Sequence, residues 1–164
     1  MKYDTIVAID PDVEESGVAE LSPQHRLLEV TNLSFPELLE YLQARKKMSD
    51  TAHTSLVVVV EAGWLSHSNW HLKNSDSKRI ASAKGNSTGR NHETGRKIVE
   101  MAKHYGLEVV EHTPLRKCWK GKDGKITHEE LASFTGLTGK TNQDMRDAAL
   151  LCWTFAGLPI KLKV

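Results

Sequence analysis

Four acidic residues are spaced along the chain in a way that suits metal-assisted hydrolysis of a phosphodiester. Asp10 ends the apolar run IVAID, and Glu61 ends the run LVVVVE. Asp144 and Asp147 lie three residues apart at the start of TNQDMRDAALLCW, a segment with the composition of a helix. Carboxylates at the ends of buried strands are costly unless something pairs with them. Divalent cations bound between converging carboxylates would stabilise them, and such cations promote attack of water on phosphorus.

A parallel pair of strands would bring the first two acids together. The run LVVVV at 56–60 has no polar alternation, which predicts burial on both faces and a strand parallel to the first. The carboxyl ends of such neighbours meet at one sheet edge, about 4.8 Å apart, so Asp10 and Glu61 could share one ion. The spacing of Asp144 and Asp147 places them on one face of a helix, about 5–6 Å apart at Cβ. Acids at a helix start are also common for capping alone.

The remaining pattern predicts an α/β fold in a single domain spanning residues 1–164. We expect a mixed five-stranded sheet with helices on both faces, in the order βββαβαβα, which begins as an antiparallel meander. Ser34 and Asn142 are the expected N-caps of two helices, and Thr127 with Glu130 forms a capping box. The expected strands cover 3–10, 16–21, 26–33, 56–60 and 107–112, and the expected helices cover 35–47, 93–105, 127–134 and 142–157.

Charge is distributed unevenly, although the net charge is only +1. Residues 73–97 carry +5 and residues 116–125 carry +4, so the rest of the chain carries −8. A basic face beside an acidic site is typical of polyanion binding, and Lys84 and Arg90 are candidate nucleic-acid contacts within it. The alternative is that both basic stretches are solvated loops.

Residues 66–92 are almost entirely polar and predict a mobile loop or a weakly formed helix. Trp64 precedes this stretch and Trp70 lies within it, and either indole could stack on an unpaired base or cap the edge of the core. His67 and His71 have a spacing compatible with a metal ion, but histidines outside a fuller ligand motif are more often solvated or in contact with phosphate.

The overall composition places the chain among cytoplasmic proteins. No stretch approaches the ~18 apolar residues of a membrane span, and MKYDTIVAID does not have the form of a signal peptide. Cys118 and Cys152 do not form a disulfide framework. We therefore expect a reducing compartment and no contact with a membrane.

Several motifs occur in an order that resembles the RuvC-type Holliday-junction resolvases of the ribonuclease H-like superfamily. The resemblance extends over nearly the whole chain, and its most specific piece is DxxD at the head of an Ala/Leu-rich final helix. It implies a ribonuclease H-like fold and cleavage of branched DNA. The segments that carry it are IVAIDP followed by Ser16 and Gly17, VVVVEAGW, GRNHETGRKIVEMAKHYGLEVVEHTP, KITHEELASFTGL and TNQDMRDAALLC.

The resemblance also implies roles for individual residues. Lys125 would be a basic catalytic residue near the scissile phosphate, and either Lys117 or Lys120 would be a second such residue. Trp64 would match an aromatic residue that probes the junction centre. The sequence departs from the family at Asp12, where glycine is usual, and the extra negative charge could weaken DNA approach or alter metal preference. The metal ligands would be Asp10, Glu61, Asp144 and Asp147, holding two Mg²⁺ ions for which Mn²⁺ could substitute.

The resemblance further implies partners. Four-way DNA junctions are the expected substrate, and the expected assembly is a homodimer that nicks two opposed strands, with a branch-migration helicase as a further partner. The helix over 93–105 would then provide a dimer face, or it would only cover the sheet. Two alternatives to this function are a ribonuclease H-like nuclease acting on RNA–DNA hybrid and a non-catalytic nucleic-acid-binding module.

Overall fold

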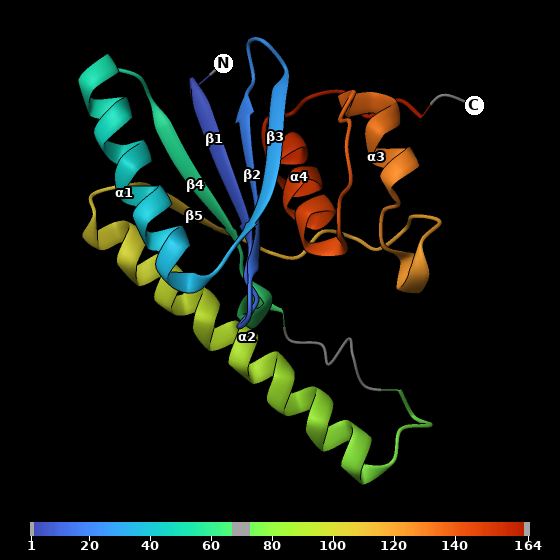
Figure 1. Ribbon diagram of the computed structural model, residues 1–164. Helices are drawn as coiled ribbons and strands as arrows, with labels where there is room; N and C mark the ends of the chain where they lie inside the picture. The colour runs from blue at the N-terminus through green and yellow to red at the C-terminus, as the bar shows by residue number, and fades with distance from the viewer. Residues whose placement is uncertain (1, 67–72, 163–164) are drawn as a thin grey trace.

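A five-stranded mixed sheet forms the centre of the computed structural model, which describes residues 2–66 and 73–162 (Figure 1). The strands are β1 (Thr5–Asp10), β2 (Ser16–Ser22), β3 (Leu27–Leu33), β4 (Leu56–Glu61) and β5 (Glu108–His112). Their order across the sheet is β3-β2-β1-β4-β5. The first three strands form an antiparallel meander, and β4 and β5 continue the sheet parallel to β1. This is the mixed sheet that the sequence predicts.

Helices cover both faces of the sheet, as predicted (Figure 1). Both α3 and α4 follow β5, where the sequence predicts helices over 127–134 and 142–157, although the order βββαβαβα counts only one of them. The predicted caps are present: Met145 N–H donates to the Asn142 side chain, and Thr127 and Glu130 form their capping box. The helices are α1 (Phe35–Ala52), α2 (Lys78–His104), α3 (His128–Thr135) and α4 (Gln143–Phe155), with single 3-10 turns at Gly63–Leu65 and Lys122–Gly124.

Strand alternation divides the core into two layers. Ile6 and Ala8 of β1 pack on the α4 side, whereas Val7 and Ile9 pack on the side of α1 and α2. The four consecutive valines of β4, residues 57–60, are completely buried, as their unbroken apolar run predicts. Because side chains alternate, the last residue of β1 and the last residue of β4 both belong to the α4 face.

The main correction to the sequence prediction concerns α2. The stretch 66–92 was expected to be a loop or a weak helix, but α2 begins at Lys78, with Ile80 N–H donating to the Ser77 side chain at 3.3 Å. Figure 1 shows its first half extending away from the sheet. That half lacks an apolar period because it has no sheet to cover. His67, Trp70 and His71 lie outside the described residues.

The second half of α2 covers the sheet. Gly95, Ile98, Val99 and Ala102 are its buried residues, and the last three belong to the core layer shared with α1. Of the two roles predicted for the segment 93–105, the structure supports the covering one for this face. Within the described part of the chain no helix is long and apolar enough to cross a membrane, and Cys118 and Cys152 are free thiols.

Candidate active site

Five residues form a row across the α4 face of the sheet, at the end where β1, β4 and β5 terminate. We call it the polar row: Asn32, Gly17, Asp10, Glu61 and His112. The register pairs Asn32 with Gly17, Gly17 with Asp10, and Glu61 with His112. The pairing between the parallel strands β1 and β4 ends at Ile9 and Val60. Asp10 and Glu61 come directly after these two residues and are therefore neighbours. The predicted meeting of these two acids at one sheet edge is therefore present.

Gly17 lets the first turn of α4 approach the polar row. A Cβ atom at this position would lie 2.1 Å from the main-chain oxygen of Asp144, so any side chain would displace the helix. The backbone of Asp144 consequently rests on the strand beside Asp10. The sequence presented Gly17 only as part of a motif, and its steric role became visible only when the helix was placed on the sheet.

The four acids influence one another electrostatically. Burial, followed by the charges of Glu61, Asp147 and Asp144, raises the pKa of Asp10 well above its ordinary value. Burial and then Asp147 raise the pKa of Glu61, which the charge of Lys125 opposes. Burial also raises the pKa of Asp144. The structure thus collects into one neighbourhood the four carboxylates that the sequence separates by up to 137 positions, the distance from Asp10 to Asp147.

Lys125 provides a positive charge within this group. Its Nζ donates to Asp147 Oδ2 at 2.9 Å, while Gln143 Nε2 donates to Asp147 Oδ1 at 2.7 Å. Gln143 Nε2 and Arg146 Nε both donate to the main-chain oxygen of Ile126, which joins the segment carrying Lys125 to α4. Burial lowers the pKa of Lys125, but the hydrogen bond that it donates to Asp147 and the charges of Asp147, Asp10 and Asp144 together raise that pKa overall. Sequence reasoning identified Lys125 and missed Gln143 and Arg146.

These acids do not form a ready-made metal-ligand group. Across residues 2–66 and 73–162, no set of three His, Cys, Asp or Glu side chains is already placed to hold an ion. Asp147 instead has Lys125 and Gln143 on its two oxygens. The acids lie close enough to raise one another's pKa, and their role as metal ligands stays a prediction.

The other predicted basic contacts fall into two places. Lys117 and Lys120 are exposed in the segment before α3, and Lys117 is the one whose charge lowers the pKa of Glu61. Lys84 and Arg90 lie on the projecting half of α2, where Arg90 is exposed. Lys84 forms an ion pair with Asp76 at 2.6 Å, which holds the segment before the helix.

Trp64 packs against α2. A Cβ on Gly95 would lie 2.4 Å from its ring, so that glycine provides the space for the indole. Arg96 lies over the ring at 5.6 Å from the centroid, and Trp64 Nε1 donates to Glu111 Oε1 at 3.1 Å. The Trp64 indole already has partners within the protein, which it would have to leave to contact a junction. That contact stays a prediction.

Asp12 has a structural task that the sequence did not suggest. Asn91 of α2 donates from Nδ2 to Asp12 Oδ2 at 3.2 Å and accepts from Val13 N–H at 3.2 Å. The β1–β2 loop is thereby tied to the middle of α2. Asp12 also contributes, after burial, to the raised pKa of Asp144.

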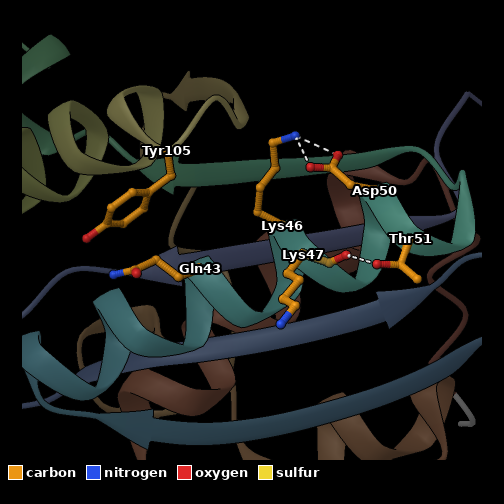
Figure 2. A pocket seen from close by; sticks show the side chains of 6 residues that line it. All are labelled: Gln43, Lys46, Lys47, Asp50, Thr51 and Tyr105. Atoms are coloured by element: carbon orange, nitrogen blue, oxygen red, sulfur yellow. Dashed lines mark hydrogen bonds and ion pairs between the residues drawn. The ribbon is translucent and has the colours of Figure 1, made fainter.

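A pocket of about 330 Å³ lies on the opposite face of the molecule, between α1 and the end of α2 (Figure 2). Its one ammonium–carboxylate pair is already satisfied, since Lys46 Nζ donates to Asp50 Oδ1 at 2.6 Å. Thr51 donates to the main-chain oxygen of Lys47 within α1. The Lys46–Asp50 pair and the Thr51 hydroxyl are thus used internally, and we assign this pocket no function.

Comparison with solved structures finds several chains that match this one, among them a RuvC protein. The structure of T. thermophilus RuvC in complex with a Holliday junction substrate matches 93% of this chain and 92% of that chain, with 15% sequence identity and a TM-score of 0.45. No family model and no curated protein sequence matches the chain. The functional argument therefore depends on the site itself.

Proposed function

We propose that this protein is a divalent-metal-dependent endonuclease that cleaves branched DNA, with four-way junctions as substrate. The observation that carries the proposal is the incompletely compensated charge of four acids, which are Asp10 and Glu61 of the polar row and Asp144 and Asp147 of α4. Asp10 and Glu61 at adjacent strand ends face Asp144 and Asp147, and the pKa values of Asp10, Glu61 and Asp144 are raised. Four acids kept together against their repulsion need a cation, and the positive charges of Lys125 and Lys117 oppose the raised pKa of Glu61 without cancelling it.

The donor set fits a hard divalent cation, because Mg²⁺ and Mn²⁺ prefer carboxylate oxygens. The residues that would hold it are the four acids, and when bound it would supply Lewis-acid activation of water and phosphate. Lys125 would exchange its contact with Asp147 for the phosphate of the DNA strand. Gln143, which donates to the other oxygen of Asp147, would keep that carboxylate oriented during the exchange.

The choice of DNA rests on charge and on the sequence motifs. Lys117 and Lys125 lie close enough to Glu61 to lower its pKa, so cations border the acids on one side. The projecting half of α2 adds Arg90 and further exposed basic residues at a distance from the acids. Four-way junctions and a homodimer that nicks two strands follow from the resemblance to RuvC-type resolvases.

A nicking assay tests this function directly. The wild type is incubated with a synthetic four-way junction or an RNA–DNA hybrid of equal length, in Mg²⁺, Mn²⁺ or chelator. We expect paired symmetric nicks in the junction with either ion, and none with chelator. Asp147→Asn is expected to lower the rate by roughly a thousandfold or more, since removing a cation ligand withdraws several kcal/mol of transition-state stabilisation. Asp50→Asn, on the opposite face, is the matched control and should nick like the wild type.

The alternatives give different results in the same assay. Preferential cleavage of the hybrid would identify a ribonuclease H-like activity. A wild type that binds junctions and nicks them with neither ion would contradict the enzyme and leave a nucleic-acid-binding module.

A further inference from the structure

The first half of α2 extends beyond the end of the sheet at which β1 and β4 terminate (Figure 1). We call residues 78–90 the α2 arm. Asn91, at the base of this arm, donates to Asp12 in the β1–β2 loop at 3.2 Å. Because that loop follows β1 directly, the arm leaves the molecule beside the end of the sheet that carries Asp10. From Asn91 to Arg79 the helix advances about 18 Å, at 1.5 Å per residue.

The α2 arm carries cations and no acids. Lys78, Arg79, Lys84 and Arg90 lie in residues 78–90, and neither Asp nor Glu does. The charge of Lys84 is already used, since its Nζ donates to Asp76 Oδ2 at 2.6 Å. Arg79 and Arg90 form no ion pair with any residue that the structure describes. Two guanidinium groups of the arm are therefore uncompensated.

Both arginines lie on the face of the helix that points away from the rest of the chain. At 3.6 residues per turn, Arg79, Asn86 and Arg90 fall within roughly 40° of one another around the helix axis. All three are exposed. The partly buried positions of the arm lie on the other face, which continues into the buried face of the second half: Ala81, Lys84, Thr88 and Gly95.

The chemistry of the exposed face indicates what it binds. Arginine and asparagine side chains donate to phosphate oxygens, and a face with donors and no carboxylate suits a polyanion. The face has no large apolar side chain, which a stable interface with another protein would bury at its centre. Arg79 and Arg90 are separated by about 16 Å along a straight helix, the rise of roughly 5 base pairs of duplex DNA.

We propose that the α2 arm binds the phosphate backbone of the DNA duplex that flanks the candidate active site. Arg79 and Arg90 donate to phosphates of this flanking duplex, and Asn86 faces it between them. Lys84, which the sequence suggested as a nucleic-acid contact, instead holds the arm through Asp76. The assignment rests on the proposed function in taking DNA as the ligand, but the contact requires neither a metal ion nor cleavage.

A binding assay in chelator tests the arm separately from the chemistry. The double variant Arg79→Gln/Arg90→Gln removes both guanidinium groups. We expect it to bind a four-way junction about thirtyfold more weakly than the wild type at about 50 mM salt. At about 200 mM salt the deficit should be about threefold, because losing two phosphate contacts lowers the salt slope by about 1.8.

The matched control is Arg26→Gln/Lys47→Gln. It removes the same charge from exposed positions elsewhere, in the β2–β3 turn and on α1. Its affinity should stay within about twofold of the wild type at both salt concentrations, since distant surface charges are screened. With saturating junction and Mg²⁺, the arm variant should nick within about twofold of the wild-type rate, because the arm supplies binding and not chemistry.

A short patch of neutral methylphosphonates, moved stepwise along the flanking duplex, distinguishes direct contact from a structural role. Where the patch meets the arm, it should weaken wild-type binding about tenfold and leave binding by the double variant unchanged. A patch that weakens both proteins equally at every position overturns the assignment, and so does a deficit that is the same at both salt concentrations. If the double variant does not fold, as judged by circular dichroism, the same patch scan on Arg90→Gln decides.

Sedimentation of the wild type and the double variant tests a second copy of the chain as the partner. The two proteins should sediment alike, and a double variant that loses a bound copy would overturn DNA as the ligand of the arm. A wild type that nicks junctions, with a double variant that binds them equally well, overturns only the role of the arm. A wild type that nicks with no ion, and whose binding still depends on both arginines, overturns only the nuclease.

Discussion

Two polar clusters lie on opposite faces of the same sheet, and they differ in how their charge is compensated. On the α1 face, Glu20 of β2 accepts from Arg45 Nε at 2.7 Å and from the Tyr41 hydroxyl. Arg45 also lies over the Tyr41 ring, 5.3 Å from its centroid. Here one carboxylate has one guanidinium, and both side chains remain about a quarter exposed, at 22% and 27%.

The acid cluster on the α4 face has no such balance. The ammonium groups of Lys125 and Lys117 lie near the four carboxylates, yet the pKa values of Asp10, Glu61 and Asp144 are raised, in each case chiefly by burial. A charge network that only stabilises a fold would resemble the Glu20 cluster. Residual electrostatic strain, and not the presence of buried charge, distinguishes the face that carries the proposed site.

The two clusters are also assembled differently, and a substitution at Gly17 should therefore have the largest effect on stability and nicking. Long side chains build the Glu20 cluster, whereas the acid cluster needs close backbone contact at Gly17. Gly17→Ala should destabilise the protein by roughly 1–3 kcal/mol, because a Cβ would lie 2.1 Å from the Asp144 oxygen. It should also reduce nicking, since α4 carries two of the acids. Urea unfolding and the nicking assay measure both effects, and Gly89→Ala, with open space around its Cβ, is the control.

A substitution in the Glu20 cluster should change the stability of the protein and leave its nicking rate unchanged. Glu20→Gln removes the charge partner of Arg45 and is expected to lower the free energy of unfolding by about 1–2 kcal/mol without changing the nicking rate of the folded protein. Asp50→Asn breaks an exposed pair on the same helix, in which the Asp50 side chain is 61% exposed, and should cost no more than about 0.5 kcal/mol. A nicking defect in Glu20→Gln would remove the distinction between the two faces.

When divalent ions are removed, the acid cluster should make the protein less stable as the pH rises. The pKa values of Asp10 and Glu61 lie above their ordinary values of 3.8 and 4.5, so the native state binds more protons than the unfolded chain in the interval above those values. The contribution of these groups to the free energy of unfolding therefore falls as pH rises through that interval. In chelator, Asp10→Asn should be more stable than the wild type near neutral pH, by about 1 kcal/mol.

That advantage should shrink as the pH falls, because the wild-type carboxyl becomes protonated, and adding Mg²⁺ should reverse it. Thermal melts of both proteins across pH, with and without Mg²⁺, provide the measurement. An advantage that does not change with pH would mean that Asp10 carries no electrostatic strain.

The sequence predicted most of the fold because local patterns were strong. The valine run of β4 and the side-chain caps at Thr127 and Asn142 each leave a local signature, and the structure contains them all. The first half of α2 was missed because a helix that covers no sheet shows no apolar period. Its second half, with Ile98 and Ala102 buried, was found for the converse reason.

The candidate site divides in the same way. The sequence alone determined which carboxylates end strands and share a helical face, because strand and helix periodicity fix these relations locally. Only the tertiary structure decided that Gly17 admits α4 to the sheet, that Gln143 and Lys125 hold Asp147, and that His112 borders Glu61. Such contacts depend on strand order and on the separation of packed elements, which no short stretch of sequence encodes.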